Sequence, residues 1–196
     1  RVSVLTNGSL LQAHQVERLL DAGLEKVVIS MDSADPERFR LLRTGRLEVV
    51  REGISRLMAR RRERGLTAPA VGISAPIQRA FTDDIPGLVE FYLALGLDGG
   101  IGYQPLNPAE PYARQYPPEL LGQFLTLADL DALFRPIRDN PALNHVMAGS
   151  SPHRGLYDEL FEPLVRGERA CPWLERGAYV TTSGCVTPCC MLHDEH

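Results

Sequence analysis

The residue type that points most directly to chemistry is cysteine. All four cysteines of this 196-residue chain lie in its last 26 residues, at Cys171, Cys185, Cys189 and Cys190. A disulfide-stabilised fold would spread its cysteines along the chain, so this pattern predicts a local metal or redox site in a reducing cytosol. A hairpin that turns at Gly184 would bring Cys171 and Cys189 together. Paired thiolates of this kind bind iron–sulfur clusters or Zn²⁺.

Two other interpretations of the tail remain open from the residues alone. Cys185, Cys189, His193 and His196 could form a zinc site with C-x3-C and H-x2-H spacings. Zinc sites usually separate their two ligand pairs by about a dozen residues, whereas the gap here is three. The cysteines could also be buried structural residues, although the adjacent pair after Pro188 disfavours this.

A second group of polar residues follows apolar, strand-like segments. The group is Thr6, Asn7 and Gly8, then Ser30 and Asp32, then Gln78, then Gln104 and Pro105. In parallel α/β folds, ligands bind at the carboxyl ends of the strands. Ser30 and Asp32 are two residues apart, so both face the same side of a strand, and a carboxylate beside a hydroxyl suits a diol such as a ribose. The alternative is that these residues only cap turns and helices.

The elements that would position these residues alternate between two periods. Strands are predicted at about 2–5, 26–31, 70–77 and 100–104, with helices after Ser9, after Asp35-Pro36, over about 48–64 and after Thr82. Gly23, Gly65 and Gly96 are predicted to end three of these helices. The pattern indicates a parallel α/β sheet with right-handed crossovers. Four strands are too few to close an eight-stranded barrel, so they form part of one or an open sheet.

The rest of the chain is organised differently. Five prolines within 105–118 predict a connector that is neither helix nor central strand. Helical patterns follow at about 120–134 and 156–165, and a short hairpin is predicted at 178–187.

Composition narrows the class of function. A net charge of −4 argues against a nucleic-acid binder, and no apolar run approaches the length of about 20 residues that a membrane span needs. With no signal peptide, the expected location is cytoplasmic. The chain starts at Arg1 on a strand-like segment and stops six residues after Cys190, so we expect a fragment of a longer protein.

Four runs in the first half resemble a radical S-adenosylmethionine (SAM) enzyme: LTNGSLL at 5–11, VISMDS at 28–33, DPERF at 35–39 and RTG at 43–45. The later Cys-x12-Gly-x4-Cys, with PW at 172–173 and PCC at 188–190, resembles the opening of the SPASM extension, which holds auxiliary iron–sulfur clusters. The resemblance implies the last four strands of a partial TIM-type (β/α)6 barrel in 1–118. It further implies a helical linker in 119–168 and the β-hairpin start of a SPASM domain in 169–196.

The resemblance also implies roles for individual residues. Ser30 and Asp32 match positions near the ribose and methionine of SAM, Gln104 and Pro105 match the segment near the adenine, and Thr6, Asn7 and Gly8 match residues lining the cavity. Cys171 and Cys189 match ligands of an auxiliary [4Fe–4S] cluster, with the adjacent Cys190 as a further candidate ligand. Arg43 matches a frequent arginine of the family, and a surface ion pair is the alternative for it.

Two defining features of the family are absent from the sequence. The CxxxCxxC motif of the SAM-cleaving cluster and the glycine-rich motif are expected before Arg1, and the remaining SPASM cysteines after His196. The resemblance therefore implies that this fragment alone is inactive. The full-length enzyme would generate a 5′-deoxyadenosyl radical, modify a peptide or protein, and take electrons from a flavodoxin or ferredoxin. The alternatives are a non-catalytic radical-SAM-like peptide-binding partner and a zinc-bearing α/β-barrel enzyme.

Overall fold

The computed structural model describes residues 2–43, 45–106, 113–143, 146, 179–180 and 185–187. The chain divides into two compact units, Arg1–Ser151 and Pro152–His196. No helix among the described residues is both long and apolar enough to cross a membrane.

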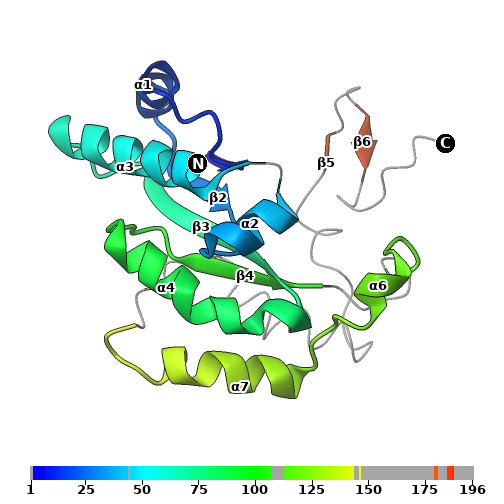
Figure 1. Ribbon diagram of the computed structural model, residues 1–196. Helices are drawn as coiled ribbons and strands as arrows, with labels where there is room; N and C mark the ends of the chain where they lie inside the picture. Colours follow the sequence, from blue (N-terminus) through cyan, green and yellow to red (C-terminus); the bar gives the residue numbers. More distant parts are fainter. Residues whose placement is uncertain are drawn as a thin grey trace. The chain divides into compact units, whose positions relative to one another are not determined.

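The first unit is built on a four-stranded sheet (Figure 1). Its strands are β1 (Ser3–Thr6), β2 (Lys26–Ser30), β3 (Ala70–Ile77) and β4 (Ile101–Pro105), and their order in the sheet is the order in the chain. Every neighbouring pair is parallel. The predicted parallel α/β fold is therefore confirmed, and each strand lies within one or two residues of its predicted position.

Helices fill the crossovers between these strands. They are α1 (Ala13–Asp21), α2 (Pro36–Leu42), α3 (Leu47–Glu63) and α4 (Ile85–Ala94), with the 3₁₀ helix η1 (Arg79–Asp84) before α4. Gly23, Gly65 and Gly96 follow the caps of α1, α3 and α4 with φ values of +64°, +64° and +62°. Glycine adopts this left-handed conformation without the steric cost of a Cβ, which is why these predicted helix ends are correct.

Two predicted helix starts are wrong. Helix α1 begins at Ala13 after Gln12, and the Ser9 hydroxyl instead donates to the Asn7 side chain at 2.8 Å. Helix α4 begins at Ile85, because residues 79–84 form η1, within which the Thr82 hydroxyl donates to the Arg79 carbonyl at 3.2 Å. In both cases a polar side chain makes a local bond that competes with its role as a helix cap. The start at Asp35-Pro36 is correct.

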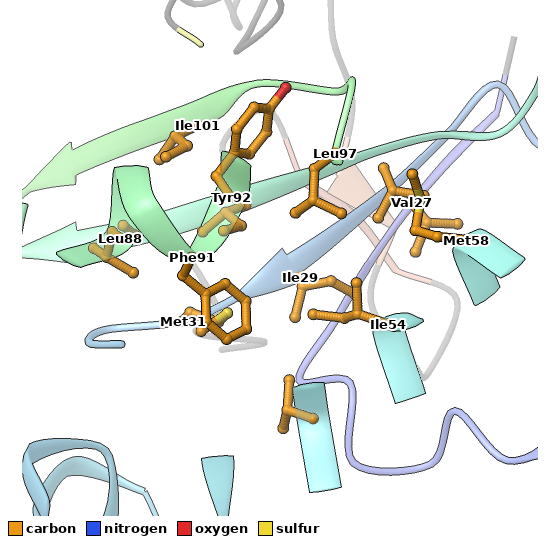
Figure 2. Packing of buried hydrophobic residues seen from close by; sticks show 14 of the residues in the cluster. Val27, Ile29, Met31, Ile54, Met58, Leu88, Phe91, Tyr92, Leu97 and Ile101 are labelled. Carbon is orange, nitrogen blue, oxygen red and sulfur yellow. The ribbon is translucent and has the colours of Figure 1, made fainter. Parts of the chain in front are cut away.

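The hydrophobic core lies between one face of the sheet and the helices (Figure 2). We call this face of the sheet the core face; it carries Val27, Ile29, Val71, Ile73 and Ile101, each at most 1% exposed. The helices contribute a second set of buried side chains, which includes Val16, Leu20, Ile54, Leu57, Met58, Leu88, Phe91 and Tyr92.

After β4 the chain continues as α6 (Pro118–Leu121) and α7 (Leu127–Arg138). The single helix predicted over 120–134 is therefore interrupted. The break ends in a capping box, in which the Thr126 hydroxyl and the Asp129 side chain each accept a hydrogen bond from the other residue's backbone N–H. Helix α7 packs on the sheet through Phe134, whose ring lies 4.6 Å from that of Tyr103 in β4.

In the second unit, β5 (Tyr179–Val180) pairs with β6 (Val186–Thr187) in antiparallel fashion, as the predicted hairpin requires. Cys185 precedes β6 and is exposed. The predicted helix at 156–165 and the predicted ligands Cys171, Cys189 and Cys190 lie outside the described residues.

Candidate functional site

Strand β2 has two chemically different sides. Val27 and Ile29 are fully buried on the core face, whereas Val28 and Ser30, which alternate with them, are only half-buried. Ser30 is paired in register with Ser74 of β3, and Ser74 with Gly102 of β4. Because residues in register point to the same side of a sheet, Ser30 and Ser74 lie together on the opposite face, which we call the site face.

Three predicted site residues meet at the carboxyl end of β2. The Arg43 guanidinium donates from Nε to Oδ2 of Asp32, and from Nη2 to the Ser30 hydroxyl at 2.8 Å. We call Ser30, Asp32 and Arg43 the β2 cluster. The side chains of Asp32 and Arg43 are 17% and 23% exposed, so this ion pair is largely shielded from water rather than a solvated surface pair. Neither of these two bonds involves Nη1 of Arg43.

Helix α2 connects the two halves of the β2 cluster. Asp32 lies before this helix and Arg43 caps its C-terminal end. The segments on either side of the seven-residue helix must therefore turn back towards each other for the two side chains to meet. The turn into α2 is fixed by short bonds. The buried Ser33 hydroxyl accepts from the Asp35 N–H, and the Asp35 carboxylate accepts from the Arg38 N–H, both at 2.9 Å. Ser33 was not among the predicted site residues.

The predicted residues at the end of β1 do not join this cluster. Thr6 is in register with Ile29, so its side chain is on the core-face side, and its hydroxyl accepts from the Gly8 N–H at 3.2 Å. The Asn7 carboxamide oxygen accepts from the Ser9 N–H at 3.0 Å. These residues form a tight turn, in which Gly8 is buried with φ +74°.

The last predicted pair lies farther along the sheet. Gln104 and Pro105 end β4, in register with Pro76 and Ile77 of β3. Gln104 is exposed, and β3 separates its strand from the β2 cluster. The structure therefore places Gln104 at the same carboxyl edge as Ser30 and Asp32 but not in contact with them.

A salt bridge that the sequence did not suggest joins the segments that follow β2 and β3. Arg38 of α2 donates to both carboxylate oxygens of Asp83, at 2.7 and 2.8 Å, and to Oδ1 of Asp84 at 2.6 Å. The hydrogen bonds from Arg38 hold the pKa of Asp83 below its usual value. The two adjacent carboxylates at 83–84 were the one sign in the sequence that a cation could bind here, and nothing identified Arg38 as that cation.

Comparison with curated proteins finds relatives over different parts of the chain. A tungsten-containing aldehyde ferredoxin oxidoreductase cofactor-modifying protein from Pyrococcus furiosus is 25% identical over 193 residues, which cover 96% of this chain and 49% of the relative. GTP 3′,8-cyclase 1 from Pseudomonas aeruginosa is 37% identical over 95 residues, covering 47% of this chain and 27% of the relative. The chain thus spans half or less of these proteins. No protein-family model matches it.

Solved structures agree on the fold. SuiB from Streptococcus suis, in a crystal structure with its precursor peptide SuiA, has a TM-score of 0.67 at 18% identity over 96% of this chain and 42% of the SuiB chain. The structure of SuiB bound to S-adenosylmethionine gives a TM-score of 0.64 at 15% identity over 99% of this chain and 44% of that one. These matches show that the chain is similar to radical SAM enzymes and that its four-stranded parallel sheet has the fold found in SuiB.

Proposed function

We propose that the intact protein is a radical SAM enzyme that modifies a peptide or protein, and that this chain supplies the wall of the barrel that faces SAM. The observation that carries the proposal is the β2 cluster, in which a hydroxyl, a carboxylate and a guanidinium meet at the carboxyl edge of a parallel sheet. This edge is where parallel α/β folds bind their ligands.

The donors and acceptors of the β2 cluster fit the polar groups of SAM. SAM carries a ribose diol, which a carboxylate such as Asp32 binds as an acceptor. It also carries a methionine carboxylate, which suits the Nη1 edge of Arg43 that neither bond of the cluster uses. The Ser30 hydroxyl, which accepts from Nη2 of Arg43, can serve either group. Because Asp32 and Arg43 are mostly buried, their bonds to SAM would be well shielded from water.

Other residues of the chain would complete the binding wall. Gln104 and Pro105, at the same edge, would lie near the adenine. Of the three predicted residues at the end of β1, Asn7 is exposed and would line the cavity, whereas the Thr6 hydroxyl already accepts a hydrogen bond within the turn. When bound and reduced by its cluster, SAM would supply a 5′-deoxyadenosyl radical that abstracts a hydrogen atom from the substrate. The protein side chains would hold SAM and the substrate in line and exclude water.

The tail and the partners belong to the same proposal. Cys171 and Cys189, with Cys190 as a neighbour, would begin an auxiliary [4Fe–4S] site in a SPASM domain at 169–196, after a barrel part in 1–118 and a linker in 119–168. SuiB is described with a bound precursor peptide, which supports a peptide substrate here. The electron donor would be a flavodoxin or ferredoxin, in the cytoplasm.

The first experiment tests SAM chemistry in the full-length protein after anaerobic reconstitution with iron and sulfide. We expect reductant-dependent release of 5′-deoxyadenosine, and weaker SAM binding in Ser30→Ala and Arg43→Gln. Ser3→Ala is the matched control, because Ser3 is on the site face at the opposite, amino end of the sheet. SAM binding by Ser30→Ala and Arg43→Gln that equals that of Ser3→Ala would contradict the assignment of the β2 cluster.

The second experiment tests the tail. Cys171→Ala and Cys189→Ala should each lower the iron content and the broad absorbance at about 400 nm that iron–thiolate sites show. Unchanged iron would overturn the ligand assignment. Bound iron with no SAM cleavage would favour a non-catalytic peptide-binding partner, and stoichiometric zinc would favour the zinc-bearing enzyme.

A further inference from the structure

Helix α2 carries Arg43 but has few apolar contacts to hold it in place. Phe39 is its one buried residue, and Leu41 is 81% exposed. A cavity of about 430 Å³ lies beside its first turn, lined by residues that include Ala34, Pro36, Asp83 and Phe91. The first turn of α2 is therefore not packed tightly against α4, and a single aromatic side chain cannot by itself fix a seven-residue helix.

Arg38 supplies a second attachment for α2, and its partners Asp83 and Asp84 line this cavity. Its guanidinium holds Asp83 through two parallel hydrogen bonds and Asp84 through a third, and it lies 5.8 Å from the centre of the Phe81 ring. These partners belong to η1, which follows the carboxyl end of β3. Arg38 thus joins the segment after β2 to the segment after β3, with the planar geometry that makes arginine–carboxylate pairs directional.

The burial of Asp84 makes its ion pair with Arg38 important for holding η1 to α2. Its side chain is 9% exposed, and its Oδ2 is buried without a hydrogen-bond partner. In the part of the chain that the structure describes, Arg38 is the side chain that balances its charge. A buried carboxylate that loses its cation is strongly unfavourable, so η1 and α2 would separate or rearrange without Arg38.

We propose that Arg38 is a positioning residue for SAM binding: by fixing α2 to η1, it keeps Arg43 in contact with Asp32 and Ser30. The inference rests on the proposed function of the β2 cluster. Arg38 itself is not a member of that cluster, and its effect is transmitted through the helix that ends at Arg43.

The same helix offers a matched control. Arg40 pairs with Glu37 at 2.7 Å, but the two side chains are 71% and 76% exposed, which is the kind of surface pair that contributes little. Arg38→Gln and Arg40→Gln therefore remove the same charge from the same helix. Only the first removes a contact between α2 and another element.

The test uses the full-length reconstituted protein and measures SAM cleavage as a function of SAM concentration. We expect Arg38→Gln to raise KM for SAM about tenfold, because small displacements of binding groups are costly. Its kcat at saturating SAM should remain within about threefold of wild type, since Arg38 bonds Asp83 and Asp84 rather than the residues of the β2 cluster. Arg40→Gln should match wild type. Arg38→Lys should restore part of the affinity, because an ammonium group neutralises Asp84 but cannot form the two parallel hydrogen bonds to Asp83.

A second measurement is independent of SAM. Hydrogen exchange without SAM should show faster exchange of the amides of residues 37–43 in Arg38→Gln than in Arg40→Gln. Equal exchange, or equal KM values in the two variants, would overturn the inference. If the wild-type protein neither binds nor cleaves SAM, the proposed function fails, and the exchange comparison still decides whether Arg38 fixes α2.

Discussion

The two faces of the sheet differ in what they bury and in how they are held. The core face presents Val27, Ile29 and Ile73 to the helices, and each is at most 1% exposed. The site face carries Ser30, Ser74 and the exposed Gln104, and Leu5 on this side is 63% exposed. Burial of apolar area stabilises the first face, whereas directed polar bonds organise the second. Substitutions on the core face should therefore change stability, and substitutions on the site face should change binding.

The largest difference between the two faces is expected when adjacent residues of β2 are truncated. Ile29→Ala empties a fully buried position and should cost about 3 kcal/mol of unfolding free energy. Val28→Ala, on the half-buried site face, should cost at most about 1 kcal/mol. Urea unfolding of the intact protein measures both. Equal costs would mean that the two faces are not distinct.

A second test uses two glycines that share a left-handed conformation. A Cβ on Gly8 would lie 3.0 Å from Cγ1 of Val50 and 3.2 Å from Cγ2 of Ile29, whereas one on Gly23 would meet nothing within 4 Å. Gly23→Ala should cost about 1 kcal/mol, from backbone strain alone. Gly8→Ala adds crowding against the core face and should cost about 2–3 kcal/mol. Urea unfolding measures both variants. If Gly8→Ala lowers the unfolding free energy no more than Gly23→Ala, the neighbouring core side chains can move to accommodate the added Cβ.

A third test concerns α7, which extends the core face through Phe134. Thr126 caps this helix, so Thr126→Ala should lower the unfolding free energy by about 1 kcal/mol. Thr82→Ala is the control, because the Thr82 hydroxyl bonds only to the carbonyl of its own turn and caps no helix. If Thr82→Ala lowered the unfolding free energy as much as Thr126→Ala does, Thr82 would act as a helix cap, as the sequence predicted.

The smallest expected effect is a pH dependence at the same capping box. Hydrogen bonds from the Thr126 backbone and hydroxyl, and then from Arg79, lower the pKa of Asp129 from 3.8 to about 2. Because the folded-state pKa is depressed, this stabilisation is complete above 3.8 and is lost as the pH falls towards 2. Asp129→Asn should therefore flatten the acid side of the stability profile. Parallel profiles for variant and wild type between these pH values would contradict the assignment.

The fold was largely predictable because its signals are local. β-branched runs mark the strands, and a glycine after each of three helices provides the left-handed residue that ends it. The starts of α1 and α4 were not predictable in the same way. Ser9 and Thr82 have the right chemistry for a cap, but each hydroxyl finds a nearer partner, and only the folded turn decides between the two bonds.

The candidate site shows the same division. The two-residue spacing of Ser30 and Asp32 predicts that they share a face, and β2 places Ser30 on the site face. For Thr6 the face could not be read from the sequence: the register of β1 pairs it with Ile29, so its side chain lies on the core-face side. A single residue of register reverses the side of every side chain in a strand.

The sequence by itself determined the order of strands and helices, the polar residues that follow the strands and the family that the chain resembles, because propensities and motifs are properties of neighbouring residues. Only the tertiary structure decided which of those polar residues meet. Arg43 reaches Asp32 across α2, and Arg38 reaches Asp83 and Asp84, 45 and 46 residues farther along the chain. Contacts at such separations depend on how the crossovers pack on the sheet, and no local pattern encodes that packing.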